Sequence, residues 1–204
     1  MIAVIDYGAG NLRSVVNALG RLGCPAKITS APDELINAEA VILPGVGAAA
    51  DTMTSLEKLG LVIPVRRFIA EGQPFLGVCI GLQILLTTTE EGSGQECLGI
   101  IPGVVRRLPP GLKIPHMGWN QVRQRFPHPI FKGIPDEADF YFVHSYYAAP
   151  DDRSLVAGET EYGSSICSVI ARGNLVATQF HPEKSGEMGL KIYDNFIRMV
   201  RERR

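Results

Sequence analysis

Hydrophobic positions in the first half of the chain alternate between short apolar runs and longer segments with helical spacing. The apolar runs, which predict buried strands, cover residues 2–7, 26–29, 41–43 and 75–79. Apolar residues also recur at 12, 15, 16, 19 and 22, the spacing of a helix that Gly23 and Pro25 would end. Further helical segments are predicted at residues 33–38, 51–58, 63–71 and 81–88. This alternation predicts right-handed crossovers and a parallel sheet with both faces covered.

The second half of the chain has a different pattern, dominated by strand-like segments. These cover residues 100–108, 116–123, 140–148, 155–157, 166–171 and 175–180. A helix is predicted only at residues 187–203, where apolar side chains recur on one face. Strands without intervening helices predict antiparallel additions to the sheet. We therefore expect an α/β fold in one domain spanning residues 1–204, with no linker and no internal repeat.

Composition narrows the classes of partner. A chain of 204 residues, of which 46% are hydrophobic, can bury about 70% of its unfolded surface, enough for one substantial core. The net charge of -1, from 20 basic and 21 acidic residues, gives no electrostatic footprint for nucleic acid or an anionic membrane. No apolar run reaches the roughly 18 residues that would span a bilayer.

The cysteines and the N-terminus indicate a reducing compartment. Cysteines stand at 24, 79, 97 and 167 without C-x-x-C spacing, which argues against a zinc site or a disulfide framework. The first residues lack the basic segment of a signal peptide and fit a strand instead. We expect a cytoplasmic protein whose thiols are reduced.

The segment Gly77-Val78-Cys79-Ile80-Gly81-Leu82-Gln83 follows a predicted buried strand and places small residues two positions before and after a thiol. This is the thiol version of the G-x-S-x-G nucleophile elbow, in which a sharp strand-to-helix turn exposes the central side chain. The first helical N–H groups would favour the thiolate. A buried structural cysteine beside two packing glycines is the alternative, and this segment alone does not exclude it.

A second segment, Gln179-Phe180-His181-Pro182-Glu183-Lys184, supplies the groups that would activate such a thiol. His181 and Glu183 are two residues apart, so in extended backbone their side chains leave on the same side, and Pro182 favours that extension. Glu183 would then orient one ring nitrogen while the other faces the sulfur. A solvated turn after a strand is the alternative for this segment alone. Together the two segments predict a triad of Cys79, His181 and Glu183.

The loop Pro44-Gly45-Val46-Gly47 also follows a predicted strand. Ligands of parallel sheets bind at the carboxyl ends of the strands, so this loop is expected beside Cys79. Backbone N–H groups of Val46 and Gly47 would join that of Ile80 in an oxyanion hole. Two glycines would let the loop reorient, so the hole would form only in an activated state. A plain strand-ending turn is the alternative.

These motifs resemble those of the class I, or triad, glutamine amidotransferases. Further segments resemble one group among them, the glutaminase subunits of imidazole glycerol phosphate synthase; the resemblance covers essentially the whole chain. These segments are Asp6-Tyr7-Gly8-Ala9-Gly10-Asn11-Leu12, Pro115-His116-Met117-Gly118-Trp119-Asn120 and Tyr141-Phe142-Val143-His144-Ser145-Tyr146.

The resemblance implies a flavodoxin-like three-layer sandwich that hydrolyses L-glutamine to glutamate and ammonia without a metal or organic cofactor. Cys79 would form a γ-glutamyl thioester, His181 would move the protons and Glu183 would orient His181. Gln83, Ser145 and Tyr146 would bind glutamine, beside an oxyanion hole of Val46, Gly47 and Ile80.

The resemblance also implies a partner. Ammonia would pass to a cyclase subunit of the HisF type, a (β/α)₈ barrel that makes imidazole glycerol phosphate and an aminoimidazole carboxamide ribotide. The implied interface residues are Asn11, Trp119, Asn120, Tyr141 and Lys184. Trp119 is the only tryptophan, and its neighbours Gly118 and Asn120 predict a turn that presents the ring.

Other functions use part of the same signal. A solitary thiol hydrolase would use the same triad without a partner, and a non-catalytic binding protein would keep only the fold. The glutaminase of pyridoxal phosphate synthesis shares the elbow but not the Pro-His-Met-Gly-Trp-Asn segment. His144, between strand residues, is expected to be a hydrogen-bonded structural residue and not a second base.

Overall fold

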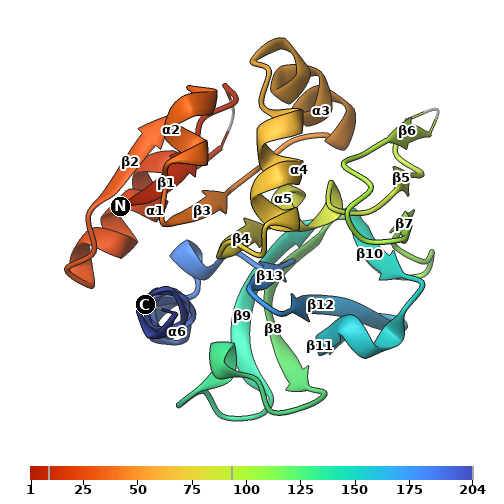
Figure 1. Ribbon diagram of the computed structural model, residues 1–204. Helices are drawn as coiled ribbons and strands as arrows, with labels where there is room; N and C mark the ends of the chain where they lie inside the picture. Colours follow the sequence, from red (N-terminus) through yellow and green to blue (C-terminus); the bar gives the residue numbers. More distant parts are fainter. Residues whose placement is uncertain (9, 93, 204) are drawn as a thin grey trace.

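A nine-stranded sheet is the centre of the computed structural model, which describes residues 1–8, 10–92 and 94–203 (Figure 1). Ala9, in the predicted loop after the first strand, lies outside the described residues. Within the described part, the strand order is β2-β1-β3-β4-β13-β12-β11-β8-β9. The first five of these strands are parallel, and the other four are antiparallel additions.

The parallel half comes mainly from the N-terminal part of the chain. It consists of β1 (Ile2–Ile5), β2 (Ala26–Thr29), β3 (Ala40–Leu43), β4 (Phe75–Val78) and β13 (Leu175–Thr178). The helices between or after them are α1 (Leu12–Arg21), α2 (Pro32–Ile36), α3 (Ala49–Lys58), α4 (Val62–Ala70) and α6 (Gly186–Glu202). The predicted alternation of strands and helices is confirmed.

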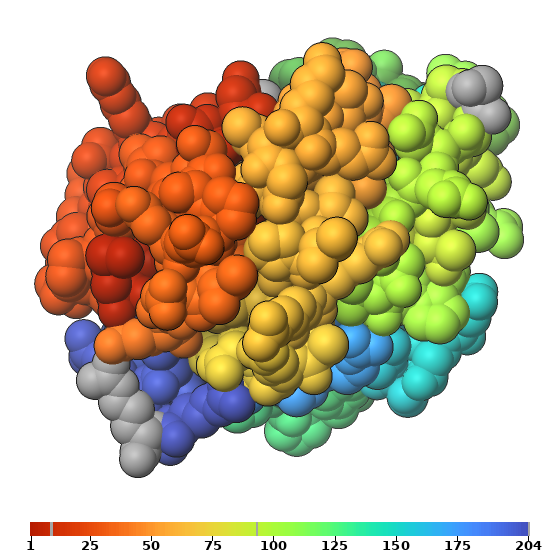
Figure 2. All heavy atoms as spheres, turned by 45° about the horizontal axis from the view of Figure 1, so that its top comes forward, coloured from red at the N-terminus to blue at the C-terminus, as the bar shows by residue number. Residues whose placement is uncertain are grey.

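Two apolar cores cover the two faces of this sheet, because alternate strand residues point to opposite sides. Ala3 and Ile5 pack with side chains of α2, α3 and α4, whereas Ile2 and Val4 pack with those of α1 and α6. Helices on both faces of a sheet give the expected three-layer sandwich. In the space-filling view, α3 and α4 lie between the N-terminal elements and the segment around residues 85–107 (Figure 2).

The antiparallel half comes from the second half of the chain, as predicted. It consists of β8 (His116–Gln124), β9 (Ala138–His144), β11 (Val156–Glu161) and β12 (Ser165–Arg172). β13 lies between β12 and β4 and runs parallel to β4, so the residues after β13 emerge beside the end of β4. This arrangement brings the segment containing His181 to the same rim as Cys79.

The single strand predicted at residues 140–148 is wrong, because the chain bends at Ser145 and its two parts enter different sheets. The first part is β9, which pairs with β8; the second is β10 (Tyr146–Pro150), which pairs with β7 (Gly103–Arg107). The Ser145 carbonyl accepts a hydrogen bond from Leu108 N at 2.9 Å. β10 and β7 join β5 (Thr88–Thr89) and β6 (Gln95–Glu96), which the hydrophobic pattern does not predict, in a second sheet.

The helix predicted at residues 81–88 is also wrong in length, since α5 covers only Ile80–Gln83. The carbonyls of Ile84, Leu85 and Leu86 accept hydrogen bonds from backbone N–H groups of residues 98–101 and so cannot continue a helix. The described residues also form short 3₁₀ turns at η1 (Pro129–Phe131), η2 (Arg153–Leu155) and η3 (Pro182–Lys184). Within the described part of the chain, no helix is long and apolar enough to cross a membrane.

Candidate active site

Cys79 lies at the sharp turn between β4 and α5, where the sequence predicts an elbow. Its backbone has φ 55° and ψ -104°, a conformation that costs a residue with a side chain about 1–3 kcal/mol. The Cys79 N–H donates to the Thr178 carbonyl at 2.7 Å, which ties the elbow to the end of β13. Packing and hydrogen bonding therefore maintain a strained turn at the one cysteine that the sequence singles out.

The two glycines of the elbow are required by backbone contacts. A Cβ on Gly77 would lie 2.5 Å from the Gly81 carbonyl oxygen, and a Cβ on Gly81 would lie 2.0 Å from the Leu43 carbonyl oxygen. Both contacts are with backbone atoms, which cannot swing away as a flexible side chain can. The spacing of glycines around Cys79 thus reflects the close approach of β3, β4 and α5.

His181 and Glu183 form a buried pair three to five residues after β13 ends. His181 Nδ1 lies 2.9 Å from Glu183 Oε1, and each side chain is 1% exposed. Because the carboxylate accepts from Nδ1–H, Nε2 is the nitrogen available for proton transfer. Nε2 is buried and has no hydrogen-bond partner within the described residues.

Other contacts fix the position of this pair. Glu183 Oε2 accepts a hydrogen bond from the Tyr193 hydroxyl at 3.3 Å. The His181 backbone N–H donates to the Tyr141 carbonyl at 3.0 Å, and the Ser185 hydroxyl donates to the His181 carbonyl at 2.7 Å. The histidine is therefore anchored through its ring, its N–H and its carbonyl.

Cys79 and His181 interact electrostatically. Burial alone would lower the pKa of His181, but the side chains and charges of Cys79 and Glu183 outweigh burial and raise it to about 9. Nε2 makes no hydrogen bond to the Cys79 sulfur, but Cys79 and His181 follow the neighbouring parallel strands β4 and β13. Sulfur and imidazole, far apart in the sequence, thus converge at one rim of the sheet.

Replacing Cys79 with alanine is expected to lower the pKa of His181, because it removes one of the two partners that raise it. NMR titration of the imidazole would measure the shift, with Cys24→Ala as a matched control. Since the folded-state pKa of about 9 exceeds the usual 6.5, protonated His181 stabilises the fold below pH 6.5. That contribution is lost as the pH rises towards 9. An unchanged titration in Cys79→Ala would contradict the proximity of the two groups.

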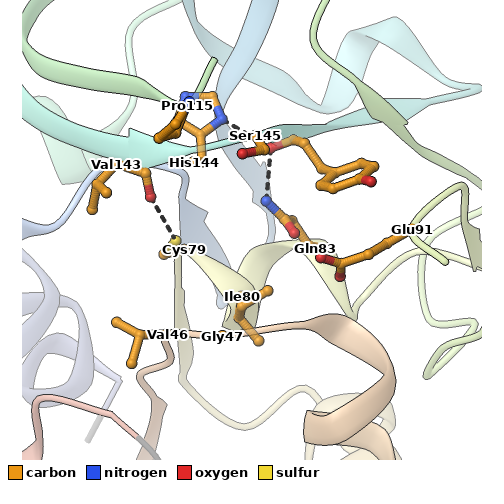
Figure 3. A pocket seen from close by; sticks show the side chains of 11 residues that line it. Val46, Gly47, Cys79, Ile80, Gln83, Glu91, Pro115, Val143, His144 and Ser145 are labelled. Carbon is orange, nitrogen blue, oxygen red and sulfur yellow. Dashed lines mark hydrogen bonds between the residues drawn. The ribbon is translucent and has the colours of Figure 1, made fainter.

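A cavity of about 240 Å³ opens beside Cys79. This is about the liquid volume of eight waters, in the size range of one free amino acid. In Figure 3, Val46 and Gly47 lie on one side of the cavity and Val143, His144 and Ser145 on the other, with Cys79 between them. The three residues predicted to bind glutamine, Gln83, Ser145 and Tyr146, all line this cavity.

The orientation of Gln83 limits what it can offer a ligand. Its Nε2 donates to the Tyr146 carbonyl at 2.8 Å and to Gln179 Oε1 at 3.2 Å. Both amide hydrogens are thereby used, so Oε1 alone remains to accept a hydrogen bond from a ligand such as an α-ammonium group.

Glu91 also lines the cavity, although the sequence pattern gives no sign of it. Its Oε2 accepts from Ala49 N at the start of α3 at 2.7 Å. The cavity therefore contains a carboxylate opposite Cys79, as Figure 3 shows.

The three predicted oxyanion residues, Val46, Gly47 and Ile80, line the same cavity. Gly47 has φ +107°, a conformation that favours glycine. A Cβ on Gly45 would lie 2.4 Å from the Tyr7 hydroxyl oxygen and 3.0 Å from Ile80 Cβ. The loop therefore packs against both Tyr7 and α5 and is joined to the wall that bears Cys79.

The fold and this geometry match known proteins along nearly the whole chain. The profile of the family "Glutamine amidotransferase class-I" matches residues 3–200. The chain is 57% identical over 200 residues to an "Imidazole glycerol phosphate synthase subunit HisH" of Dehalococcoides mccartyi, covering 98% of each chain. It is 54% identical to the HisH subunit of Moorella thermoacetica, over 98% of this chain and 95% of that one.

The chain belongs to the class-I glutamine amidotransferase family.

Solved structures support the fold of this amidotransferase. It resembles the structure described as "PurLQS from Thermotoga maritima" with a TM-score of 0.77 at 17% identity, covering 97% of each chain. A crystal structure of a glutamine amidotransferase matches with a TM-score of 0.75 at 20% identity, covering 98% of this chain and 99% of that one. These likenesses confirm the predicted flavodoxin-like fold.

His144, which lines the amidotransferase cavity, is paired with a second buried histidine, His116, for which the sequence gives no signal. His116 Nδ1 lies 2.9 Å from His144 Nε2, and His144 Nδ1 donates to the Tyr146 carbonyl at 2.8 Å. Burial lowers the pKa of His116 to about 4 and that of His144 to about 3. These pKa values favour neutral rings at pH 7, and His144 is hydrogen-bonded through both ring nitrogens, as expected.

Three of the five residues predicted at a partner interface, Trp119, Asn120 and Tyr141, lie near each other on β8 and β9. Trp119 is 58% exposed, and its ring meets that of Tyr141 edge-on at 6.1 Å between centroids. The predicted turn at residues 118–120 is wrong, because Trp119 lies inside β8 opposite Tyr141; strand pairing, not a turn, presents the ring. Asn120 Nδ2 lies 3.2 Å from His116 Nε2.

The two other predicted interface residues lie at the ends of helical segments. Asn11 caps α1, and Lys184 follows Glu183 in η3, where its N–H donates to the His181 carbonyl at 3.0 Å.

In residues 1–8, 10–92 and 94–203, no group of three or more His, Cys, Asp or Glu side chains is arranged as a metal site.

Proposed function

We propose that this protein is the glutaminase subunit of an imidazole glycerol phosphate synthase and hydrolyses L-glutamine to glutamate and ammonia. The observation that carries the proposal is geometric: Cys79 stands at a strained elbow in the wall of a cavity of amino-acid size, and the buried His181–Glu183 pair follows the neighbouring parallel strand. The names of relatives more than 50% identical to the chain give independent support.

In the first half of the reaction, the Cys79 sulfur attacks the side-chain amide carbon of glutamine while His181 Nε2 takes the thiol proton. His181 then gives that proton to the leaving nitrogen, the carbon–nitrogen bond breaks and ammonia departs. A γ-glutamyl thioester remains. The raised pKa of His181 suits this step, because it favours the imidazolium that must form.

In the second half, water attacks the thioester with His181 as general base. The carbon–sulfur bond breaks, the proton returns to sulfur and glutamate leaves. Glu183 keeps His181 in the tautomer whose Nε2 faces the sulfur. Backbone N–H groups of Val46, Gly47 and Ile80 stabilise the oxyanion in both halves.

Glutamine binds between Cys79 and the residues Gln83, Ser145 and Tyr146. The free Oε1 of Gln83 accepts from the α-ammonium group, since both amide hydrogens of Gln83 are already used. The Glu91 carboxylate favours the same positive group. A polar cavity of this kind selects a free amino acid over an internal residue of a peptide.

The ammonia passes directly to a cyclase subunit, a HisF-type (β/α)₈ barrel, in the cytoplasm. Docking uses Asn11, Trp119, Asn120, Tyr141 and Lys184. Support comes from the exposed Trp119 ring and from Tyr141, whose carbonyl accepts from the His181 N–H. Contact of the cyclase with Tyr141 would therefore act on a residue that is hydrogen-bonded directly to the general base, His181.

Glutamate release from glutamine is expected to rise at least 100-fold when the cyclase and its nucleotide ligand are added, because binding reorients the glycine-containing loop into an oxyanion hole. A coupled assay with glutamate dehydrogenase measures it, with Trp119→Ala as the interface variant. Full activity of the isolated subunit would favour a stand-alone thiol amidase.

A further inference from the structure

Gln179 is a fully buried polar residue that contacts the sulfur of Cys79. It is 0% exposed and lies between the end of β13 and His181. Its Nε2 donates to Cys79 Sγ at 3.6 Å, and its backbone N–H donates to the Ser168 carbonyl at 2.8 Å. Burying an amide is costly unless it is hydrogen-bonded, so its placement beside the thiol calls for a reason.

The neighbouring hydrogen bonds fix which end of the Gln179 amide faces the sulfur. Oε1 accepts from Gln83 Nε2 at 3.2 Å, and Gln83 Nε2 also donates to the Tyr146 carbonyl. A carbonyl oxygen can only accept, so Gln83 presents N–H groups to both. Gln179 therefore presents its NH₂ group to Cys79.

On its other side the sulfur lies 3.9 Å from the Val143 carbonyl oxygen, to which the thiol donates. The sulfur thus has a donor, Gln179, and an acceptor, Val143. When the thiol loses its proton, the Val143 contact becomes unfavourable and the Gln179 contact becomes charge-assisted. The amide contributes more to the thiolate than to the thiol.

We propose that Gln179 is a further catalytic residue, which stabilises and orients the Cys79 thiolate by an amide N–H and links it to Gln83 in the ligand cavity. The proposal rests on the proposed function, in which that thiolate attacks glutamine. Gln83 would transmit occupancy of the cavity to the nucleophile, because it bonds to Gln179 on one side and faces the ligand on the other.

The test uses Gln179→Met, which keeps the length but has no donor, and Gln179→Asn, which keeps the amide but cannot reach the sulfur. Both are measured in the complex with the cyclase. We expect kcat to fall about tenfold with little change in KM for glutamine. Alkylation of Cys79 by iodoacetamide, followed across a range of pH, should be slower than in the wild type, because the thiolate loses its amide donor.

Ser168→Ala is the matched control, since it removes another buried polar group, whose hydroxyl donates to Thr160. It should leave the alkylation profile unchanged. Synthesis from added ammonium does not need the glutaminase site, so it reports whether a variant folds and assembles with the cyclase. The test is decided by whichever Gln179 variant retains this ammonium-dependent activity. A wild-type kcat and alkylation profile in that variant would overturn the role of Gln179. Absence of glutamate release by the wild-type complex would instead overturn the proposed function.

Discussion

Replacing Cys79 with alanine is expected to reduce glutamine-dependent ammonia release by about 10⁴-fold or more, because no thioester can form. Cys79 is the cysteine at the strained elbow, beside the cavity and coupled to His181. Glutamate release in the presence of the cyclase subunit measures the loss. The cavity and the fold should survive, since alanine fits where cysteine does.

Two controls separate loss of the nucleophile from loss of the protein. Added ammonium should still support synthesis by the Cys79→Ala complex, because the cyclase needs only the ammonia. Cys24→Ala should retain glutamine-dependent activity, since Cys24 has no elbow. Glutamine-dependent turnover by Cys79→Ala would show that the nucleophile is misassigned.

The largest effect on stability is expected from Gly81→Ala. The added Cβ would lie 2.0 Å from the Leu43 carbonyl oxygen, so β3 and α5 would have to move apart. Such overpacking against backbone costs about 3 kcal/mol. For a chain of this length, that corresponds to a fall in Tm of about 6–12 °C. Calorimetry measures the change, and activity should fall with it because the elbow carries Cys79.

Gly20→Ala is the matched control on α1. Nothing lies within 4 Å of the Cβ that it would add, and alanine is the better helix former. Its Tm should be unchanged or slightly higher. Equal Tm values for the two variants would mean that the elbow is not packed as tightly as the structure has it.

The elements that the sequence predicts correctly are those whose signals are local. The alternation in residues 2–79 reflects strands buried on both faces and helices buried on one. Each of these patterns lies within its own segment and can be recognised without knowing the tertiary partners. The glycines around Cys79 likewise reflect contacts between neighbouring elements. The sequence therefore predicts the parallel half and brings Cys79 and His181 to the same rim.

The errors arise where distant partners decide the local structure. Residues 140–148 have continuous strand character, yet the bend at Ser145 depends on pairing with β8 on one side and β7 on the other. The end of α5 depends on the backbone of residues 98–101, which takes the carbonyls that a longer helix would need. In both cases the partners lie outside the segment whose own pattern made the prediction.

The same limit applies to the candidate site. Cys79, His181 and Glu183 lie in motifs with a mechanism, whereas Glu91, His116 and Gln179 are recognised only from the side chains around them. Gln179 stands two residues before His181, within the same motif. Its significance depends on a hydrogen bond to a sulfur that lies 100 residues away in the sequence.

The most direct test of the account is to locate the bond formed with a glutamine analogue that carries an electrophilic diazoketone in place of the side-chain amide. After incubation of the complex, peptide mass spectrometry should find one adduct, on the peptide containing Cys79, and excess glutamine should suppress it. An adduct on Cys24, Cys97 or Cys167 instead, or an active enzyme that carries no adduct on Cys79, would contradict the account.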